Sequence, residues 1–133
     1  MDAAEPIRSL TFRRRHRLSG SRSYADVFGA RMSSRCGPLV VFARPNGLDH
    51  PRLGLSIGRR AGNAVRRNAI KRRVREAFRH LQHDLDRGYD LVVTVKQHVP
   101  MPMREYQSLL QDAAADLMRK WARRERRSEE RPT

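Results

Sequence analysis

The chain has 133 residues, 38% of them hydrophobic, with 29 lysines and arginines against 14 acids and a formal net charge of +15. This length suits one domain with a modest core, and the charge predicts nucleic acid as the main partner, because it favours strong, salt-dependent binding to polyanions. No apolar run approaches the roughly 18 residues of a transmembrane helix, the arginine-rich start lacks the apolar segment of a secretory signal, and the single cysteine, Cys36, excludes an intrachain disulfide and a cysteine-built zinc site. We therefore expect a cytoplasmic protein without a membrane partner.

The first residues indicate an arm followed by a short helix. Residues 1–16 lack hydrophobic periodicity and include the run Arg13-Arg14-Arg15-His16, which predicts a flexible basic arm. Ser21 is the expected N-cap of a helix through Phe28. That helix would place Tyr24, Val27 and Phe28 on one face.

Two strands are expected next. Residues 38–43 are apolar and end at the turn Pro45-Asn46-Gly47, and residues 52–57 form a second run of the same kind. Because they are neighbours along the chain, we expect them to pair as a hairpin.

A basic helix is the most informative element of the chain. Residues 58–79 contain nine lysines and arginines and one acid, Glu76. Gly62-Asn63 supplies a loop and an N-cap, and the helix should run to about Gln82. An apolar stripe at helical spacing is expected to face the core, and it consists of Ile70, Val74, Ala77, Phe78 and Leu81. The opposite side, within an arc of roughly 100°, carries Asn68, Lys71, Arg72, Arg75 and Arg79. Because only one acid could pair with these cations, the pattern predicts a rigid surface for an external polyanion.

The last third of the chain predicts one more strand and one more helix. Gly88 marks a turn into a strand over residues 89–96. After Pro100 and Pro102, a helix is expected from Glu105 to about Arg124, and residues 125–133 are expected to form a disordered tail. The elements together predict an α/β (α+β) two-layer sandwich around a small mixed sheet, with residues 17–124 as a single domain whose charge predicts binding to nucleic acid.

Candidate catalytic groups are sparse. His80, His83 and Asp84 could place ligands on one helical turn, but they lack a further partner at a known metal-site spacing. Cys36 has no neighbouring histidine in the sequence. We therefore expect no catalytic residues and no metal site in the protein itself.

The segment from Gly54 to Phe78, which contains Gly58-Arg59-Arg60-Ala61-Gly62-Asn63-Ala64-Val65-Arg66-Arg67-Asn68, closely resembles the signature of the bacterial ribonuclease P protein component. The resemblance continues upstream to Arg17-Leu18 and downstream into the last helix, so that it covers roughly residues 13–122. It implies the order αβββαβα with a left-handed βαβ crossover, against the usual right-handed preference.

The resemblance also implies an activity and its partners. The expected protein is the subunit of a bacterial, cytoplasmic endoribonuclease that removes the 5′ leader from precursor tRNA. A catalytic RNA would perform the cleavage with bound magnesium, and the protein alone would be inactive. The protein is expected to be a monomer, in a 1:1 complex with the RNA, and to bind the precursor tRNA leader.

The residues implied by the resemblance form two groups. The group that would bind the catalytic RNA comprises Arg67, Asn68, Lys71, Arg72 and Arg75 from the resemblance, and we add to it the other cations Arg59, Arg60, Arg66 and Arg79 of the same segment. The group that would hold the single-stranded leader comprises Tyr24, Phe28, Val40, Phe42, Ser56 and Arg60, in keeping with the aromatic stacking and basic grooves that bind single strands. Ala69 stands where the family usually has arginine. Arg66 or Arg73 could supply the contact that this arginine would make. Phe28 and Phe42 could instead be core residues.

Two other functions fit the composition. One is a non-catalytic RNA-binding module, such as a ribosomal protein or an RNA chaperone. The other is a DNA-binding protein that uses residues 63–82 as a recognition helix, which the lack of a preceding helix-turn-helix partner disfavours.

Overall fold

The computed structural model describes residues 14–130. In chain order its elements are the 3₁₀ turn η1 (Arg14–His16), α1 (Ser21–Gly29), β1 (Ser33–Cys36), β2 (Leu39–Pro45), β3 (Arg52–Ser56), the 3₁₀ turn η2 (Arg59–Ala61), α2 (Ala64–Leu81), β4 (Tyr89–Val95) and α3 (Met103–Glu130). The expected order αβββαβα is confirmed. None of the helices within these residues is long and apolar enough to cross a membrane.

The four strands form one mixed sheet in the order β1-β2-β4-β3. β2 is antiparallel to both β1 and β4, whereas β3 and β4 are parallel. The expected hairpin of residues 38–43 with 52–57 is therefore wrong, because β4 lies between β2 and β3. Tyr89–Val93 of β4 are all buried. Such a strand is most stable in the interior of a sheet, where both of its edges pair with other strands and both of its faces are covered. The β3–α2–β4 crossover is present, and its left-handed sense stays a prediction.

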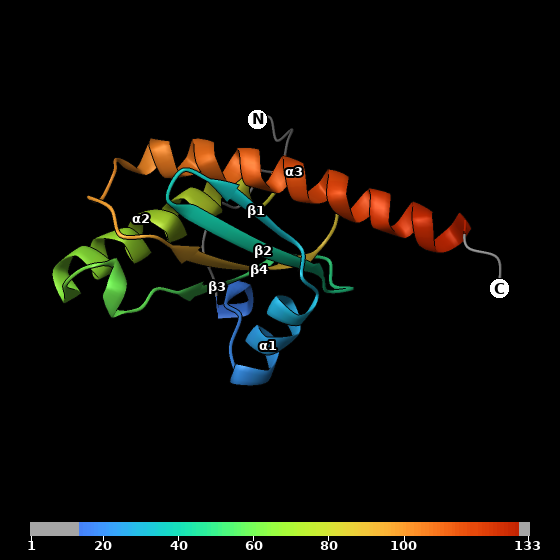
Figure 1. Ribbon diagram of the computed structural model, residues 1–133, viewed down its shortest axis with the longest axis horizontal. Coiled ribbons are helices and arrows are strands. Elements are labelled where there is room, and N and C mark those ends of the chain that lie inside the picture. The colour runs from blue at the N-terminus through green and yellow to red at the C-terminus, as the bar shows by residue number, and fades with distance from the viewer. Residues whose placement is uncertain (1–13, 131–133) are drawn as a thin grey trace, which may run out of the picture.

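Helices cover the two faces of the sheet unequally. α2 and α3 pack together against one face, where the main core includes Val41, Ile70, Phe78, Tyr106 and Leu117. A small second cluster lies under α1 on the other face, where Leu18, Val27 and Val92 are buried. Figure 1 shows α3 across the top of the view and α1 below the strands.

The expected flexible arm over residues 1–16 is wrong for its last three residues. Arg14–His16 form a turn in which His16 is only 3% exposed, and the Leu18 amide donates to the Leu53 carbonyl at 2.9 Å. The chain is therefore attached to β3 before α1 begins. Residues 1–13 of the expected arm lie outside the described residues. Gly20, at φ 89°, is the N-cap of α1 and makes no side-chain capping hydrogen bond, and Ser21, the expected N-cap, is instead the first helical residue.

The expected disordered tail is also different in the structure. α3 continues through Glu130, so that residues 125–130 are helical, and residues 131–133 lie outside the described part. Two contacts explain the continuation: Arg87 donates to both carboxylate oxygens of Glu125 at 2.8 Å, and Arg124 donates to the Ala30 carbonyl at 2.9 Å. The sequence of this segment is also rich in arginine and glutamate, which favour helix.

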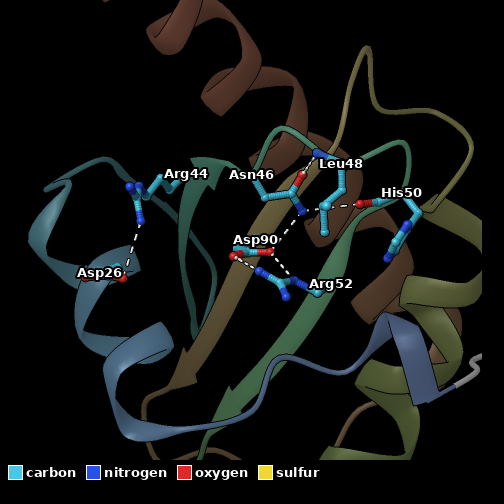
Figure 2. Close-up of polar contacts among 7 residues, drawn as sticks. All are labelled: Asp26, Arg44, Asn46, Leu48, His50, Arg52 and Asp90. Atoms are coloured by element: carbon cyan, nitrogen blue, oxygen red, sulfur yellow. Dashed lines mark hydrogen bonds and ion pairs between the residues drawn. The ribbon is translucent and has the colours of Figure 1, made fainter.

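A polar network holds the β2–β3 loop against the sheet. Asp90 of β4 is 6% exposed and accepts from Arg52 Nε at 2.8 Å, from Arg52 Nη2 at 2.7 Å and from Asn46 Nδ2 at 2.9 Å. Asn46 Nδ2 also donates to the His50 carbonyl, as Figure 2 shows. The hydrogen bond to Asp90 raises the pKa of Arg52. This network secures one end of the sheet face that α1 partly covers.

Candidate nucleic-acid interface

The basic helix forms as the sequence indicates. Asn63 caps α2, and its side chain accepts from the Arg66 amide at 2.9 Å. The buried residues of the helix are Ile70, Val74, Ala77, Phe78 and Leu81, which confirms the apolar stripe. The helix is therefore anchored along one side, and its other side carries the predicted cations.

Those side chains differ in their exposure and in their contacts with the rest of the protein. Arg66 and Arg72 are exposed, as is the neutral Asn68 beside them, whereas Arg67, Lys71 and Arg75 are half-buried. Arg79 Nη1 contacts Glu76 at 2.6 Å, so the single acid of the segment neutralises the end of the surface. The Nε atom of Arg67 is enclosed and has no hydrogen-bond partner among the described residues. The Arg67 side chain would have to move before an external acceptor could satisfy this donor.

Arg73 does not belong to this surface. Its Nη1 donates to the Met101 carbonyl at 2.9 Å, which ties α2 to the loop before α3. Of the two candidates to replace the arginine missing at Ala69, only Arg66 is exposed. Arg59 and Arg60 are exposed on η2, directly before α2.

Of the predicted leader residues, Val40, Phe42 and Ser56 lie on the sheet face that α1 partly covers, Tyr24 and Phe28 lie on α1 itself, and Arg60 lies on η2. Strand register places Arg35, Val40, Thr94 and Ser56 in one row across the four strands, and Ser33, Phe42, Val92 and Gly54 in the next. α1 packs on the second row. The ring of Phe28 contacts that of Phe42 edge to face, with 4.8 Å between centroids, and both rings pack against the small cluster while remaining half-buried.

The first row is more open. Val40 and Thr94 are half-buried, and Ser56 and Arg35 are exposed. Thr94 and Arg35 were not predicted. Strand register is the signal that finds them, because both share a row with Val40 and Ser56.

Gly54 determines where the Tyr24 ring lies. A Cβ atom at position 54 would lie 2.7 Å from Cζ and from Oη of Tyr24, so only glycine lets the ring rest against the β3 backbone. Tyr24 thereby reaches from α1 across to β3.

A pocket of about 310 Å³ joins the two predicted surfaces. Its lining comes from the segment before α1, from α1, from β3 and from α2, and comprises Arg17, Leu18, Ser19, Tyr24, Leu53, Leu55, Lys71 and Arg75. From the sequence, we expect the leader residues and the basic helix to form separate surfaces. In the structure they are contiguous, because Tyr24 and Lys71 line one pocket.

Comparisons with known proteins agree in family and fold. The family model for ribonuclease P matches residues 12–121. The chain is similar to the ribonuclease P protein component of Chromobacterium violaceum, with 52% identity over 86 residues that cover 64% of this chain and 70% of the relative. The protein component of Thermotoga maritima is 42% identical over 83 residues, which cover 62% and 71% of the two chains.

Solved structures give the same result. The ribonuclease P protein of Thermotoga maritima superposes with a TM-score of 0.66 at 31% identity, covering 77% of this chain and 96% of that one. The Staphylococcus aureus protein gives a TM-score of 0.63 at 30% identity, with coverages of 74% and 91%.

Proposed function

The chain belongs to the ribonuclease P protein family, and from this we propose that its two contiguous surfaces bind the two RNA molecules of that ribonucleoprotein. The protein is a component of the endoribonuclease complex that matures the 5′ end of tRNA. In our proposal the exposed side of α2, with Arg59, Arg60 and Arg66, binds the catalytic RNA. The open sheet face, together with Tyr24 and Phe28, holds the single-stranded leader.

One observation carries the assignment of α2. Its cations lie on a helix whose other side is fixed in the core, and the single acid of that helix, Glu76, is engaged by Arg79 and His80 at the C-terminal end. A surface of this kind repels itself unless an external polyanion binds, and a phosphate backbone supplies the matching charge.

The leader surface is supported by its chemistry. Half-buried aromatic rings on α1 and β2 lie beside an open row that contains Val40, Thr94 and Ser56. Stacking on such rings tolerates any base, as a leader of variable sequence requires. Through the shared pocket at Tyr24 and Lys71, the protein would hold the leader next to the catalytic RNA.

We assign the cleavage chemistry and its magnesium to the RNA. Within residues 14–130, no three histidine, cysteine or acidic side chains gather where they could hold a metal ion. The protein in our proposal binds and positions, as a monomer in a 1:1 complex with the catalytic RNA.

The test of the proposal is reconstitution with a bacterial ribonuclease P RNA at low magnesium. We expect the protein to restore cleavage of precursor tRNA and to cleave nothing without the RNA. Cleavage by the RNA-free protein that a point substitution abolishes would contradict the assignment of the chemistry.

Two sets of variants separate the surfaces. Arg67→Ala with Lys71→Ala should weaken assembly with the catalytic RNA and lower the salt dependence of binding, because each lost phosphate contact reduces counterion release. The matched control is Lys96→Ala with Arg104→Ala, which removes the same charges from exposed positions outside α2. Equal affinity and salt dependence in the two double variants would mean that this side of α2 is only solvated.

Tyr24→Ala and Phe42→Ala should act differently. Each removes a stacking surface worth about 1–3 kcal/mol per base, so precursor tRNA should bind the holoenzyme less tightly while mature tRNA is unaffected. Circular dichroism should first show that each variant is folded. An equal loss for both tRNAs, or no loss, would assign these rings to the core alone.

A further inference from the structure

The C-terminal turns of α3 carry a second cationic site, distant in the sequence from α2. A pocket of about 240 Å³ is lined by Met32, Lys120, Arg123, Arg124 and Arg127, which we call the C-terminal basic pocket. The matched family region ends at residue 121, so most of these cations follow it. In Figure 1 the last turns of α3 extend beyond the strands, away from α2.

The pocket arises where the inner side of α3 changes character. Leu110, Ala113 and Leu117 are buried in the main core. In the turns that follow, Lys120, Arg123, Arg124 and Arg127 share an arc of roughly 100°, one edge of which overlaps the core-facing side. Beyond the sheet, Lys120 and Arg124 lie close to the core-facing side of the helix, and Arg127 and Arg123 lie further around it toward solvent.

Two of the four cations are held in place by the protein. Lys120 Nζ donates to the Ser33 carbonyl at 2.7 Å and lies 3.1 Å from Asp116. Arg124 donates to the Ala30 carbonyl, and its guanidinium lies over the Trp121 ring at 4.7 Å from the centroid. These contacts fix part of the pocket before any ligand binds.

The other two cations have no acid partner among residues 14–130. Arg123 and Arg127 are exposed, and the nearby acids are engaged elsewhere. Glu125 is bound by Arg87. Asp116 pairs with Lys120 and Arg119, and hydrogen bonding from Ser34, followed by Lys120, lowers the pKa of Asp116. The pocket thus combines two ordered cations with two uncompensated ones.

The lining indicates which ligand fits. Among residues 14–130, no aromatic ring lines the pocket, and Trp121 is engaged by Arg124 and by the hydrogen bond from its Nε1 to the Ala43 carbonyl. Unstacked bases would therefore find no stacking surface, in contrast to the sheet face. The large exposed hydrophobic side chains of the described residues are Leu48, Val65 and Val99, none of them on α3, so the apolar contacts of a membrane-binding helix are missing there.

We propose that the C-terminal basic pocket binds the phosphate backbone of a folded segment of the ribonuclease P RNA, as a second contact separate from α2. This inference rests on the proposed function, because it needs a chain that binds that RNA. A backbone ligand uses the arginine forks without reading bases. Two separated contacts on one RNA would also fix the orientation of the protein.

The test uses the full chain with Arg123→Gln and Arg127→Gln, which leaves the contacts of Lys120 and Arg124 intact. The matched control is Arg119→Gln with Arg126→Gln, which removes two arginines from the same helix on a neighbouring side. Binding to the ribonuclease P RNA is measured across a potassium chloride series, after circular dichroism has shown that both variants are folded. We expect about a tenfold loss of affinity and a lower salt slope for the pocket variant, and little change for the control.

Three outcomes would overturn the inference. The inference is wrong if the pocket variant binds the RNA with unchanged affinity while the α2 double variant binds it more weakly. If both variants bind with unchanged affinity, the proposed function is wrong as well. Equal losses in pocket variant and control would mean that only total charge matters. If the reconstituted holoenzyme instead lost affinity for precursor tRNA and not for mature tRNA, the pocket would hold the leader and not the catalytic RNA.

Discussion

At the scale of single residues, Gly54 controls the position of Tyr24. In Gly54→Ala the new Cβ would lie 2.7 Å from the end of the Tyr24 ring, so the ring must move away from β3. Because a ring end can shift, we expect the fold to survive. We expect affinity of the holoenzyme for precursor tRNA to fall roughly fivefold to a hundredfold, as for the loss of one stacked base.

Gly58→Ala is the control for this change. A Cβ at position 58 meets no atom within 4 Å, and the φ of −91° suits any residue. Precursor affinity should therefore stay at the wild-type value. If Gly54→Ala also left it unchanged, the Tyr24 ring would not contact the leader in its present position.

Asp90 is the acid whose burial makes its ion pair important for stability. Its side chain is 9% exposed, and it accepts two hydrogen bonds from Arg52 and one from Asn46. We expect Asp90→Asn to lower the free energy of unfolding by about 2–4 kcal/mol. Arg52 loses its charge partner, and the new side-chain NH2 group faces the N–H donors of Arg52 and Asn46. Urea unfolding measures the change.

Asp26→Asn is the control for Asp90→Asn, because Asp26 forms an exposed ion pair (Figure 2). Asp26 and Arg44 are 3.6 Å apart, and each side chain is 49% exposed. An exposed pair of this geometry contributes at most about 0.5 kcal/mol. Similar losses from both substitutions would show that burial of Asp90 does not determine the strength of its network.

At the scale of elements, the two sides of α2 should respond differently to substitution. Val74 is 0% exposed in the main core, so Val74→Asp would bury a charge without a partner, at a cost of several kcal/mol. A domain with a typical stability of about 5–15 kcal/mol would largely unfold, which circular dichroism would show as lost helical signal. Arg72→Ala, on the exposed side, should keep the wild-type unfolding midpoint. A folded Val74→Asp variant would contradict the orientation of the helix.

At the scale of the whole molecule, the net charge of +15 should make stability and RNA binding depend on salt in opposite ways. Added potassium chloride shortens the screening length from about 30 Å at 0.01 M to about 8 Å at 0.15 M. Self-repulsion of the folded chain then weakens, so we expect the urea midpoint to rise. RNA affinity should fall over the same range, because counterion release becomes less favourable. A urea midpoint that falls with salt would show that ion pairs outweigh the repulsion.

The sequence by itself determined the features that depend on near neighbours. The Asn63 cap, the stripe from Ile70 to Leu81 and the strand after Gly88 all formed as expected. Each depends on periodicity or on contacts within a few residues. The family signature lies in this same stretch, so the resemblance and the basic helix could both be identified before the fold was known.

Only the tertiary structure decided which distant segments meet. It placed β4 between β2 and β3, joined Tyr24 to Lys71 in one pocket, and extended α3 through contacts of Glu125 with Arg87 and of Arg124 with Ala30. The physical reason is that strand pairing and ion pairs between distant residues depend on the folding of the whole chain. Local spacing carries no information about these contacts, so it predicted the cationic helix but not the second cationic site at the end of α3.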